Sequence, residues 1–264
     1  MTLLQCYGLR KMFGGLDAID NVDLSVDKGE VLGLIGPNGA GKTTFVNLLT
    51  GEIAPTAGRI LYRGDDISQL APHRRSGLGI ARTFQVPRPF TSLSIRENLM
   101  VGALFGKTRH EDLKERSAVV DSVLKTTGLD RIADSSPITL STAGLKRLEV
   151  ARSLAAQPDL LFLDEPLGGL NPVEADEAIL LIRDLKNRGV TIVFIEHIIK
   201  AVAAVSDRVM VLARGRKLAE GTPKDVLANE DVKRAYLGDV AGALQRNLDR
   251  TAARRAAAAQ GDTA

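Results

Sequence analysis

Cysteine and net charge are both scarce in this 264-residue sequence. Cys6 is the single cysteine, which excludes an internal disulfide and is typical of a protein kept in a reducing compartment. Basic and acidic residues number 35 and 32, and the net charge is +3. So balanced a composition provides no argument for nucleic-acid binding, and we expect no nucleic acid among the partners.

Long hydrophobic runs are also missing. The most apolar stretch, residues 190–212, is interrupted by charged side chains, whereas a membrane-spanning helix needs about 20 predominantly apolar residues in succession. Residues 1–6 do not have the basic-then-apolar pattern of a signal peptide. We therefore expect a protein that serves a membrane, if at all, through partner chains. With 44% hydrophobic residues, the chain is long enough for one large domain with or without a subdomain.

A phosphate-binding loop motif, G-x-x-x-x-G-K-[ST], occupies residues 36–43. An apolar run at 31–35 precedes it and a helix-like segment at 44–49 follows it. The glycines let backbone N–H groups converge, and the helix N-terminus adds partial positive charge, so the loop is suited to a triphosphate. A chance match in a chain this long is on the order of one in a hundred. The residues expected to bind the nucleotide are Gly36, Pro37, Asn38, Gly39, Ala40, Gly41, Lys42, Thr43 and Thr44, with Lys42 at the β- and γ-phosphates and Thr43 at Mg²⁺.

Short apolar or alternating segments at residues 3–9, 22–26 and 59–63 predict antiparallel strands that form a small β-layer beside the nucleotide. Phe13 lies in a glycine-flanked segment that we predict to be a loop. Its ring could stack on an adenine base, because a flat aromatic face offers a large contact area, or it could cover the core.

A change of pattern after Gln85 predicts an inserted helical segment. Residues 79–85 resemble a strand that ends in this polar amide, and prolines at 87 and 89 then break the pattern. Residues 94–100 and 111–125 have helical periodicity, and Pro158 ends a further helix. The helical insertion is therefore expected to span about 87–157.

Two carboxylates, Asp164 and Glu165, follow a run of four apolar residues at 160–163. Such a run is typical of a buried parallel strand, and ligands of open α/β sheets bind at the carboxyl ends of strands. We expect Asp164 to ligate Mg²⁺ through water and Glu165 to polarise an attacking water. The alternative is a pair of surface acids at the end of a strand.

His197 follows a second run of this kind at residues 190–195. A lone histidine can equally be structural, but its position at the end of a strand favours a contact with the γ-phosphate. A hairpin is predicted around residues 214–216. From about residue 241 the chain is rich in alanine and arginine, which indicates a loosely held helix or a disordered tail, with a basic contact to lipid headgroups as a less favoured alternative.

Taken in order, six features resemble the nucleotide-binding cassette of ABC transporters, over nearly the whole chain to about Gly238. They are the phosphate loop, Gln85, residues 140–144, the Asp164 and Glu165 pair, residues 168–172 and His197. Several stretches are similar to one branch, the ATPase subunits of branched-chain amino-acid importers of the LivG type; these stretches are residues 13–16, 81–85, 96–102, 169–172 and 236–238.

The resemblance implies an α/β fold: a P-loop NTPase (RecA-like) core with an antiparallel β-layer and an inserted helical subdomain. The nucleotide-binding domain would span residues 1–238, followed by an Ala/Arg-rich tail at 239–264. Two such cassettes would close head-to-tail around ATP and Mg²⁺, with Phe13 stacked on adenine and with Ser141 and Gly144 at the ATP of the opposite cassette. The catalytic residues would be Glu165, His197 and Gln85, and the magnesium site would be Thr43, Gln85 and Asp164.

The implied function is that of an ATP-hydrolysing subunit of an importer for branched-chain amino acids or a related small solute. The implied partners are integral membrane permease subunits, a second ATPase subunit of the LivF type and, indirectly, a solute-binding protein, at the cytoplasmic face of the inner membrane. Urea, amides and aromatic acids are alternative solutes. A soluble ABC-type ATPase acting on nucleic acid or the ribosome, and a P-loop kinase, are less favoured, because no second cassette, zinc-binding cysteines or acceptor lid is evident.

Residues 140–144 depart from the family pattern, because they are Leu-Ser-Thr-Ala-Gly rather than the usual Leu-Ser-Gly-Gly-Gln. Thr142 and Ala143 place side chains where the backbone is expected to approach a phosphate, and the β-branched Thr142 would crowd it more. Our hypothesis is that the ATP site completed by this segment, on the partner cassette, is the slower of two. The alternative is a small shift of the loop that leaves both sites active.

Overall fold

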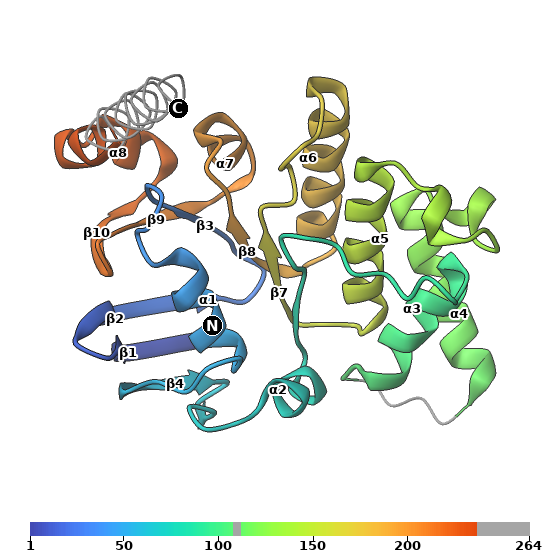
Figure 1. The fold of residues 1–264 in the computed structure, drawn as a ribbon, viewed down its shortest axis with the longest axis horizontal. Helices are drawn as coiled ribbons and strands as arrows, with labels where there is room; N and C mark the ends of the chain where they lie inside the picture. Colours follow the sequence, from blue (N-terminus) through green and yellow to red (C-terminus); the bar gives the residue numbers. More distant parts are fainter. Residues whose placement is uncertain (108–111, 237–264) are drawn as a thin grey trace, which may run out of the picture.

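A computed structural model of the chain describes residues 1–107 and 112–236 (Figure 1). These residues form a four-stranded sheet of order β2-β1-β4-β5 and a six-stranded sheet of order β10-β9-β3-β8-β7-β6. The predicted α/β fold with an antiparallel β-layer is therefore confirmed. The strands are β1 (Thr2–Phe13), β2 (Leu16–Asp27), β3 (Val31–Ile35), β4 (Ala57–Tyr62), β5 (Asp65–Asp66), β6 (Ile80–Arg82), β7 (Leu160–Asp164), β8 (Thr191–Ile195), β9 (Arg208–Ala213) and β10 (Arg216–Gly221).

Helices cover both faces of the six-stranded sheet and form a separate group beside it (Figure 1). Helix α1 lies between the two sheets, whereas α5 and α6 stand next to each other at the border with the group of helices. The helices are α1 (Lys42–Thr50), α2 (Pro72–Leu78), α3 (Ile95–Phe105), α4 (Leu113–Thr127), α5 (Thr142–Ala155), α6 (Pro172–Asn187), α7 (Ile199–Val205) and α8 (Pro223–Ala228), with single 3₁₀ turns at Asp130–Ile132 and Pro137–Thr139.

The central strands β3, β7 and β8 are buried at every position. Their side chains alternate between two cores: Leu160 and Phe162 of β7 face α1 and the β-layer, whereas Leu161 and Leu163 face α6 and α7. Burial on both faces explains why these strands are apolar throughout. Because β3, β8, β7 and β6 pair in parallel, their carboxyl ends lie along one edge of the sheet.

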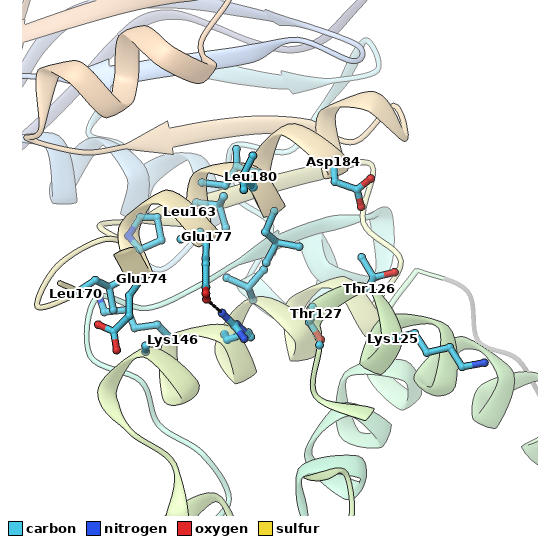
Figure 2. Close-up of a pocket in the computed structure, with 18 residues that line it drawn as sticks. Lys125, Thr126, Thr127, Lys146, Leu163, Leu170, Glu174, Glu177, Leu180 and Asp184 are labelled. Carbon is cyan, nitrogen blue, oxygen red and sulfur yellow. Dashed lines mark hydrogen bonds and ion pairs between the residues drawn. The ribbon is translucent and has the colours of Figure 1, made fainter. Parts of the chain in front are cut away.

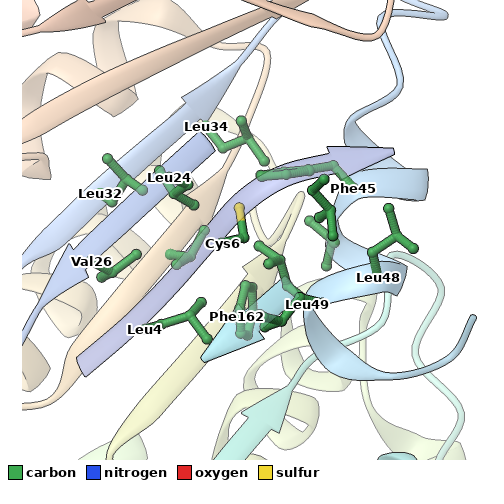
Figure 3. Packing of buried hydrophobic residues seen from close by; sticks show 14 of the residues in the cluster. Leu4, Cys6, Leu24, Val26, Leu32, Leu34, Phe45, Leu48, Leu49 and Phe162 are labelled. Carbon is green, nitrogen blue, oxygen red and sulfur yellow. The ribbon is translucent and has the colours of Figure 1, made fainter. Parts of the chain in front are cut away.

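The β-layer packs on the sheet through α1 (Figure 3). Phe45, Leu48 and Leu49 of α1 are fully buried between the β-layer and the sheet. Cys6 of β1 is buried in the same cluster, and this burial raises the pKa of its thiol to about 12. The helix that follows the phosphate loop is therefore held firmly on two sides.

Helices α3, α4 and α5 share a core of their own, which includes Leu99, Val120 and Leu148. Ser94 begins α3 with a capping box, in which its side chain accepts from the Glu97 N–H and the Glu97 side chain accepts from the Ser94 N–H. These helices lie within the segment 87–157 that was predicted as a helical insertion.

Two local predictions were wrong. Phe13 is the last residue of β1 rather than part of a loop, because a two-residue turn lets the hairpin pair as far as Phe13 and Leu16. The strand predicted at 79–85 is only Ile80–Arg82, which pairs with Leu160–Phe162; in this register Gln85 lies beyond Asp164, the end of β7, and has no partner there. The tail predicted at 239–264 lies outside the described residues. In the part of the chain that the structure describes, no helix is long and apolar enough to cross a membrane.

Candidate active site

The phosphate loop connects β3 to α1, and its backbone is tightly enclosed. A Cβ atom added to Gly36 would lie 2.1 Å from the Leu212 carbonyl oxygen, and one added to Gly41 would lie 2.7 Å from the Ala18 carbonyl oxygen. Gly41 also has a φ of 99°, in the left-handed region that favours glycine. Both glycines of the motif are therefore required by the fold at these positions.

The start of α1 is suited to an anion. Within the described residues, no side chain caps this helix and no acidic residue lies in its first turn. Lys42 Nζ donates to the carbonyl oxygens of Gly36, at 2.6 Å, and Pro37, at 3.1 Å, so the ammonium group lies over the loop. Thr43 is exposed and Thr44 half-buried in the same turn. A cation and a helix N-terminus at one point can hold phosphate groups.

Asp164 ends β7 at the same edge of the sheet, and its side chain is buried. Its backbone N–H donates to Thr83 Oγ1 at 3.1 Å. Its Oδ2 atom forms an ion pair with Arg82 Nη2 at 2.7 Å. Arg82 ends the neighbouring strand β6 and Thr83 directly follows it, so two strands determine where this carboxylate lies.

Glu165 is turned away from Asp164 by an unusual backbone conformation. Its φ is 46°, in the left-handed region, which costs a residue other than glycine about 1–3 kcal/mol. Its N–H donates to the Ile195 carbonyl oxygen at 3.0 Å. Its Oε2 atom accepts a hydrogen bond of 2.7 Å from Gln85 Nε2. The structure therefore brings together two of the three residues that were predicted to be catalytic.

Lys146 of α5 stabilises this arrangement and was missed in the sequence. Its Nζ atom donates to the carbonyl oxygens of Glu165, at 2.6 Å, and Gln85, at 3.2 Å. The side chain is buried, and burial lowers the pKa of its ammonium group. A signal was present: Lys146, Val150 and Leu154 are spaced by four residues, so the lysine lies on the buried face of the helix.

Glu196 and His197 follow β8, between the ends of β3 and β7. Glu196 is fully buried, and its carboxylate accepts from the backbone N–H groups of Leu167, at 2.9 Å, and His197, at 3.1 Å. Burial raises the pKa of this carboxyl above its ordinary value. His197 is exposed at the same edge, with Nδ1 3.6 Å from Glu196 Oε2. The strand order thus places His197 beside both the phosphate loop and Asp164.

The remaining predicted residues lie apart from this cluster. Phe13 is half exposed at the end of β1, with Lys11 Nζ 5.2 Å from its ring centroid, so one aromatic surface is accessible. Ser141 caps the N-terminus of α5, where its Oγ atom accepts from the Gly144 N–H at 3.2 Å. Ser141 and Gly144 are held by each other, and among residues 1–107 and 112–236 no hydrogen bond joins either of them to this chain's phosphate loop.

A cavity of about 540 Å³ separates α5 from α6 (Figure 2). Arg147 Nη2 and Glu177 Oε2 form an ion pair of 2.7 Å across it. Lys146 and Leu163 line one end of the cavity and Lys125 the other. Its lining includes no residue of the phosphate loop, so it is distinct from the nucleotide site.

The donor set fits magnesium bound together with a nucleotide rather than alone. Among residues 1–107 and 112–236, no three His, Cys, Asp or Glu side chains gather as a metal site would require. Magnesium commonly uses one or two protein oxygens plus phosphate oxygens and waters. Thr43, Asp164 and the amide oxygen of Gln85 could supply such ligands. A strand, a glycine loop, a helix and a carboxylate on a neighbouring strand together define a P-loop nucleoside triphosphatase.

Comparisons with known proteins identify the kind of P-loop protein. The sequence model of the ABC transporter family matches residues 19–168, and that of the branched-chain amino acid ATP-binding cassette transporter matches residues 216–242. The high-affinity branched-chain amino acid transport ATP-binding protein LivG of Escherichia coli strain K12 is 41% identical over 258 residues, which cover 90% of this chain and 98% of that protein. A probable LivG protein of Archaeoglobus fulgidus is 38% identical over 247 residues, covering 90% and 96%.

Solved structures agree with these sequence comparisons. The ADP conformation of an ATP-binding cassette of an ABC transporter superposes with a TM-score of 0.82 at 31% identity, over 90% of this chain and 99% of that chain. This chain belongs to the ABC transporter family, as an ATP-binding cassette. It is an ATPase, and the family expected from the motifs is confirmed.

Proposed function

We propose that this cassette is the ATP-hydrolysing subunit of an importer for branched-chain amino acids. The hydrogen bond between Gln85 and Glu165, beside Asp164 and at the same sheet edge as Lys42, is the observation that carries the hydrolytic part. The solute class rests on the names of the relatives, which cover 90% of this chain at 38–41% identity.

The chain's own ATP would be held by the phosphate loop, residues 36–41, and by Lys42, Thr43 and Thr44. Phe13 would stack on the adenine base, because its ring is half exposed at a strand end. Glu165 would orient and polarise the attacking water, and His197 would contact the γ-phosphate. Positioning and charge stabilisation carry most of phosphoryl transfer, and these residues supply both.

Magnesium would be bound by Thr43, Asp164 and Gln85. When bound, the ion neutralises the charge that develops on the phosphate oxygens. Gln85 donates through Nε2 to Glu165, so its other terminal atom, Oε1, is the one suited to a metal. Gln85 therefore connects the metal site to the water-activating carboxylate.

A second cassette, of the LivF type, would complete the functional dimer. Ser141 and Gly144 would bind the ATP held by that partner, since both lie at the N-terminus of α5. Lys146, one turn further along the same helix, holds the backbone of Glu165. Helix α5 would thus connect closure around the partner's ATP to the catalytic residues of this chain's own ATP site.

Permease subunits in the membrane would bind near Gln85. Its neighbours Phe84 and Val86 are 42% and 68% exposed, which is unusual for large apolar side chains and favours a protein interface. The cassette would then be a peripheral subunit at the cytoplasmic face of the inner membrane, and a solute-binding protein would act on it only through the permease. Nucleic acid is not expected among its partners.

Uptake of labelled leucine tests this proposal. Cells that lack redundant leucine carriers would contain either the intact chain or Lys42→Ala as their only copy, with the exposed Lys28→Ala as the matched control. Uptake should collapse only in the Lys42 variant. Unchanged uptake would overturn the branched-chain assignment, and the same strains should then be tested with urea, amides and aromatic acids. If no membrane subunit co-purifies with the chain, a soluble ABC-type ATPase becomes the better interpretation.

A further inference from the structure

Arg82 is the last residue of β6, and its guanidinium group lies between the two halves of the candidate site. Nη2 contacts Asp164 Oδ2 at 2.7 Å, and Nη1 donates to Asn47 Oδ1 at 2.5 Å. Asn47 belongs to α1, the helix that begins with Lys42 and Thr43. One side chain therefore connects the phosphate-loop helix with the carboxylate that would bind magnesium.

The environment of Arg82 shows that its position is specified closely. The side chain is only 10% exposed, and that of Asp164 only 7%. The guanidinium carbon lies 5.3 Å from the centroid of the Phe84 ring, so the group is also stacked. Its Nε atom is buried without a hydrogen-bond partner among the described residues. An arginine that forgoes one hydrogen bond to keep two others is placed for those two contacts.

A guanidinium group at this point has two effects on Asp164. It gives the buried carboxylate an opposite charge at hydrogen-bond distance, so that this charge is not left unpaired. It also occupies Oδ2, which leaves Oδ1 as the oxygen that can accept from a water on magnesium. The Thr83 hydroxyl, which accepts from the Asp164 N–H, prevents the backbone from shifting in response.

We propose that Arg82 is a positioning residue for the magnesium of the ATP site: it orients Asp164 and keeps it in register with α1 through Asn47. The proposal rests on the proposed function, because Asp164 must be the metal-binding carboxylate. Groups that orient the ligands of a metal commonly contribute about 10- to 100-fold to metal affinity or activity. Arg82 would act entirely through Asp164 and would not touch the nucleotide.

The test is nucleotide binding with and without the metal. The purified chain would be titrated with a fluorescent ATP analogue in EDTA and again in Mg²⁺, and the ratio of the two dissociation constants gives the gain due to magnesium. In Arg82→Met this gain should fall about 10-fold, whereas the affinity in EDTA should change little. Arg82→Lys should be intermediate, since an ammonium group keeps the charge but cannot reach both Asn47 and Asp164 as a fork.

Arg152→Met is the matched control. Arg152 of α5 is also largely buried, with 16% of its side chain exposed; it pairs with Glu149 at 2.7 Å and lies 5.4 Å from the Phe90 ring centroid, and neither partner belongs to the proposed metal site. The Arg152→Met variant should lower the melting temperature as Arg82→Met does, and it should leave the magnesium gain unchanged. An equal loss of the gain in both variants would overturn the proposal, because it would reflect general destabilisation.

Asp164→Asn distinguishes a failure of the proposed metal site from a failure of the proposed role of Arg82. If it abolishes the magnesium gain while Arg82→Met retains it, the role of Arg82 is wrong and the proposed metal site stands. If Asp164→Asn keeps the full gain, the proposed metal site is wrong, and the role of Arg82 falls with it. If Arg82→Met does not fold, Asn47→Ala takes its place. This variant removes one hydrogen-bond partner of Arg82 without leaving a buried charge unpaired. An unchanged magnesium gain in Asn47→Ala would overturn the proposal.

Discussion

Gln85 and Glu165 are joined by a 2.7 Å hydrogen bond although they lie 80 positions apart in the sequence. Gln85 lies on the segment that leaves the sheet for the helical group, and Glu165 follows β7. A movement of that segment would therefore reorient the carboxylate directly. This contact offers a physical route by which a membrane partner bound near Phe84 and Val86 could control hydrolysis.

Glu165→Gln should stop hydrolysis and preserve nucleotide binding. The amide cannot accept a proton from water, and loss of a general base commonly costs about 100-fold or more in rate. Phosphate release and nucleotide affinity would be measured on the same sample, with the exposed carboxylate variant Asp176→Asn as the control. Hydrolysis within a few-fold of the wild-type rate would show that Glu165 is not the residue that activates water.

Lys146→Met should lower both stability and the catalytic rate. Two hydrogen bonds from a buried ammonium group are lost, and Glu165 loses the contact that holds its strained backbone. We expect a loss of about 1.5–3 kcal/mol in the free energy of unfolding, measured by denaturant titration, and a rate about 10-fold lower. Lys186→Met, which removes only a surface ion pair with Asp207, should change stability by less than about 0.5 kcal/mol.

The Lys146 prediction separates positioning from stability. If the variant unfolds more readily but hydrolyses ATP at the normal rate below its melting temperature, Lys146 has a purely structural role. Nucleotide affinity should be nearly unchanged in either case, since its Nζ atom contacts backbone carbonyl groups of Gln85 and Glu165 rather than the phosphate loop.

Glu196→Gln should alter the pH dependence of stability. Burial raises the pKa of this carboxyl in the folded chain, so the folded state binds more protons than the unfolded state. The free energy of unfolding contributed by Glu196 therefore falls as pH rises through a window that begins near the ordinary value of about 4.5 and ends at the raised value. Glutamine does not titrate, so the melting temperature of the variant minus that of the wild type should increase as pH rises across this window.

The comparison would be repeated in a His197→Ala background, because the imidazole lies 3.6 Å from the Glu196 carboxylate and its removal isolates the effect of that carboxyl. A constant difference in melting temperature at all pH values would contradict the prediction. It would indicate that Glu196 has the same pKa in the folded and unfolded chains.

Thr142→Gly should speed hydrolysis at the partner's ATP site. Thr142 is exposed in the first turn of α5, beside Ser141, where the partner's phosphates would lie. Relief of about 1 kcal/mol of crowding corresponds to roughly a fivefold increase in rate. Single-turnover hydrolysis would be measured with this chain's own site silenced by Glu165→Gln, and Ala143→Gly should give a smaller increase. Equal rates with and without Thr142→Gly would contradict the idea that this segment makes one site slow.

Local patterns predicted the phosphate loop and the central strands well. A motif of eight consecutive residues and a run of apolar residues depend on neighbours in the chain, and Leu160–Asp164 is buried on both faces as its composition indicates. The same reasoning placed Asp164 and His197 at strand ends. It was wrong about Phe13, because hairpin pairing to Leu16 continues beyond what the glycine-rich turn indicates.

Lys146, Arg82 and Glu196 were not recognised; the helical spacing of Lys146 indicated its buried face, but each of the three has a partner that lies far away in the sequence. A lysine in a helix, an arginine at a strand end and a glutamate before a histidine are ordinary surface residues until a distant segment buries them. Lys146 reaches carbonyl groups 61 and 19 positions away, and Arg82 reaches a carboxylate 82 positions away.

The sequence by itself was thus sufficient to predict the class of chemistry, which is the binding of phosphate groups. Phosphate binding needs consecutive glycines, a lysine and a helix start, and these are adjacent in the chain. The positions of the carboxylates were a matter of folding: parallel pairing of β6, β7 and β8 brings Arg82, Asp164 and Glu196 to one edge. Desolvation at that edge then makes each contact specific, because a buried charge requires a partner that the linear sequence does not identify.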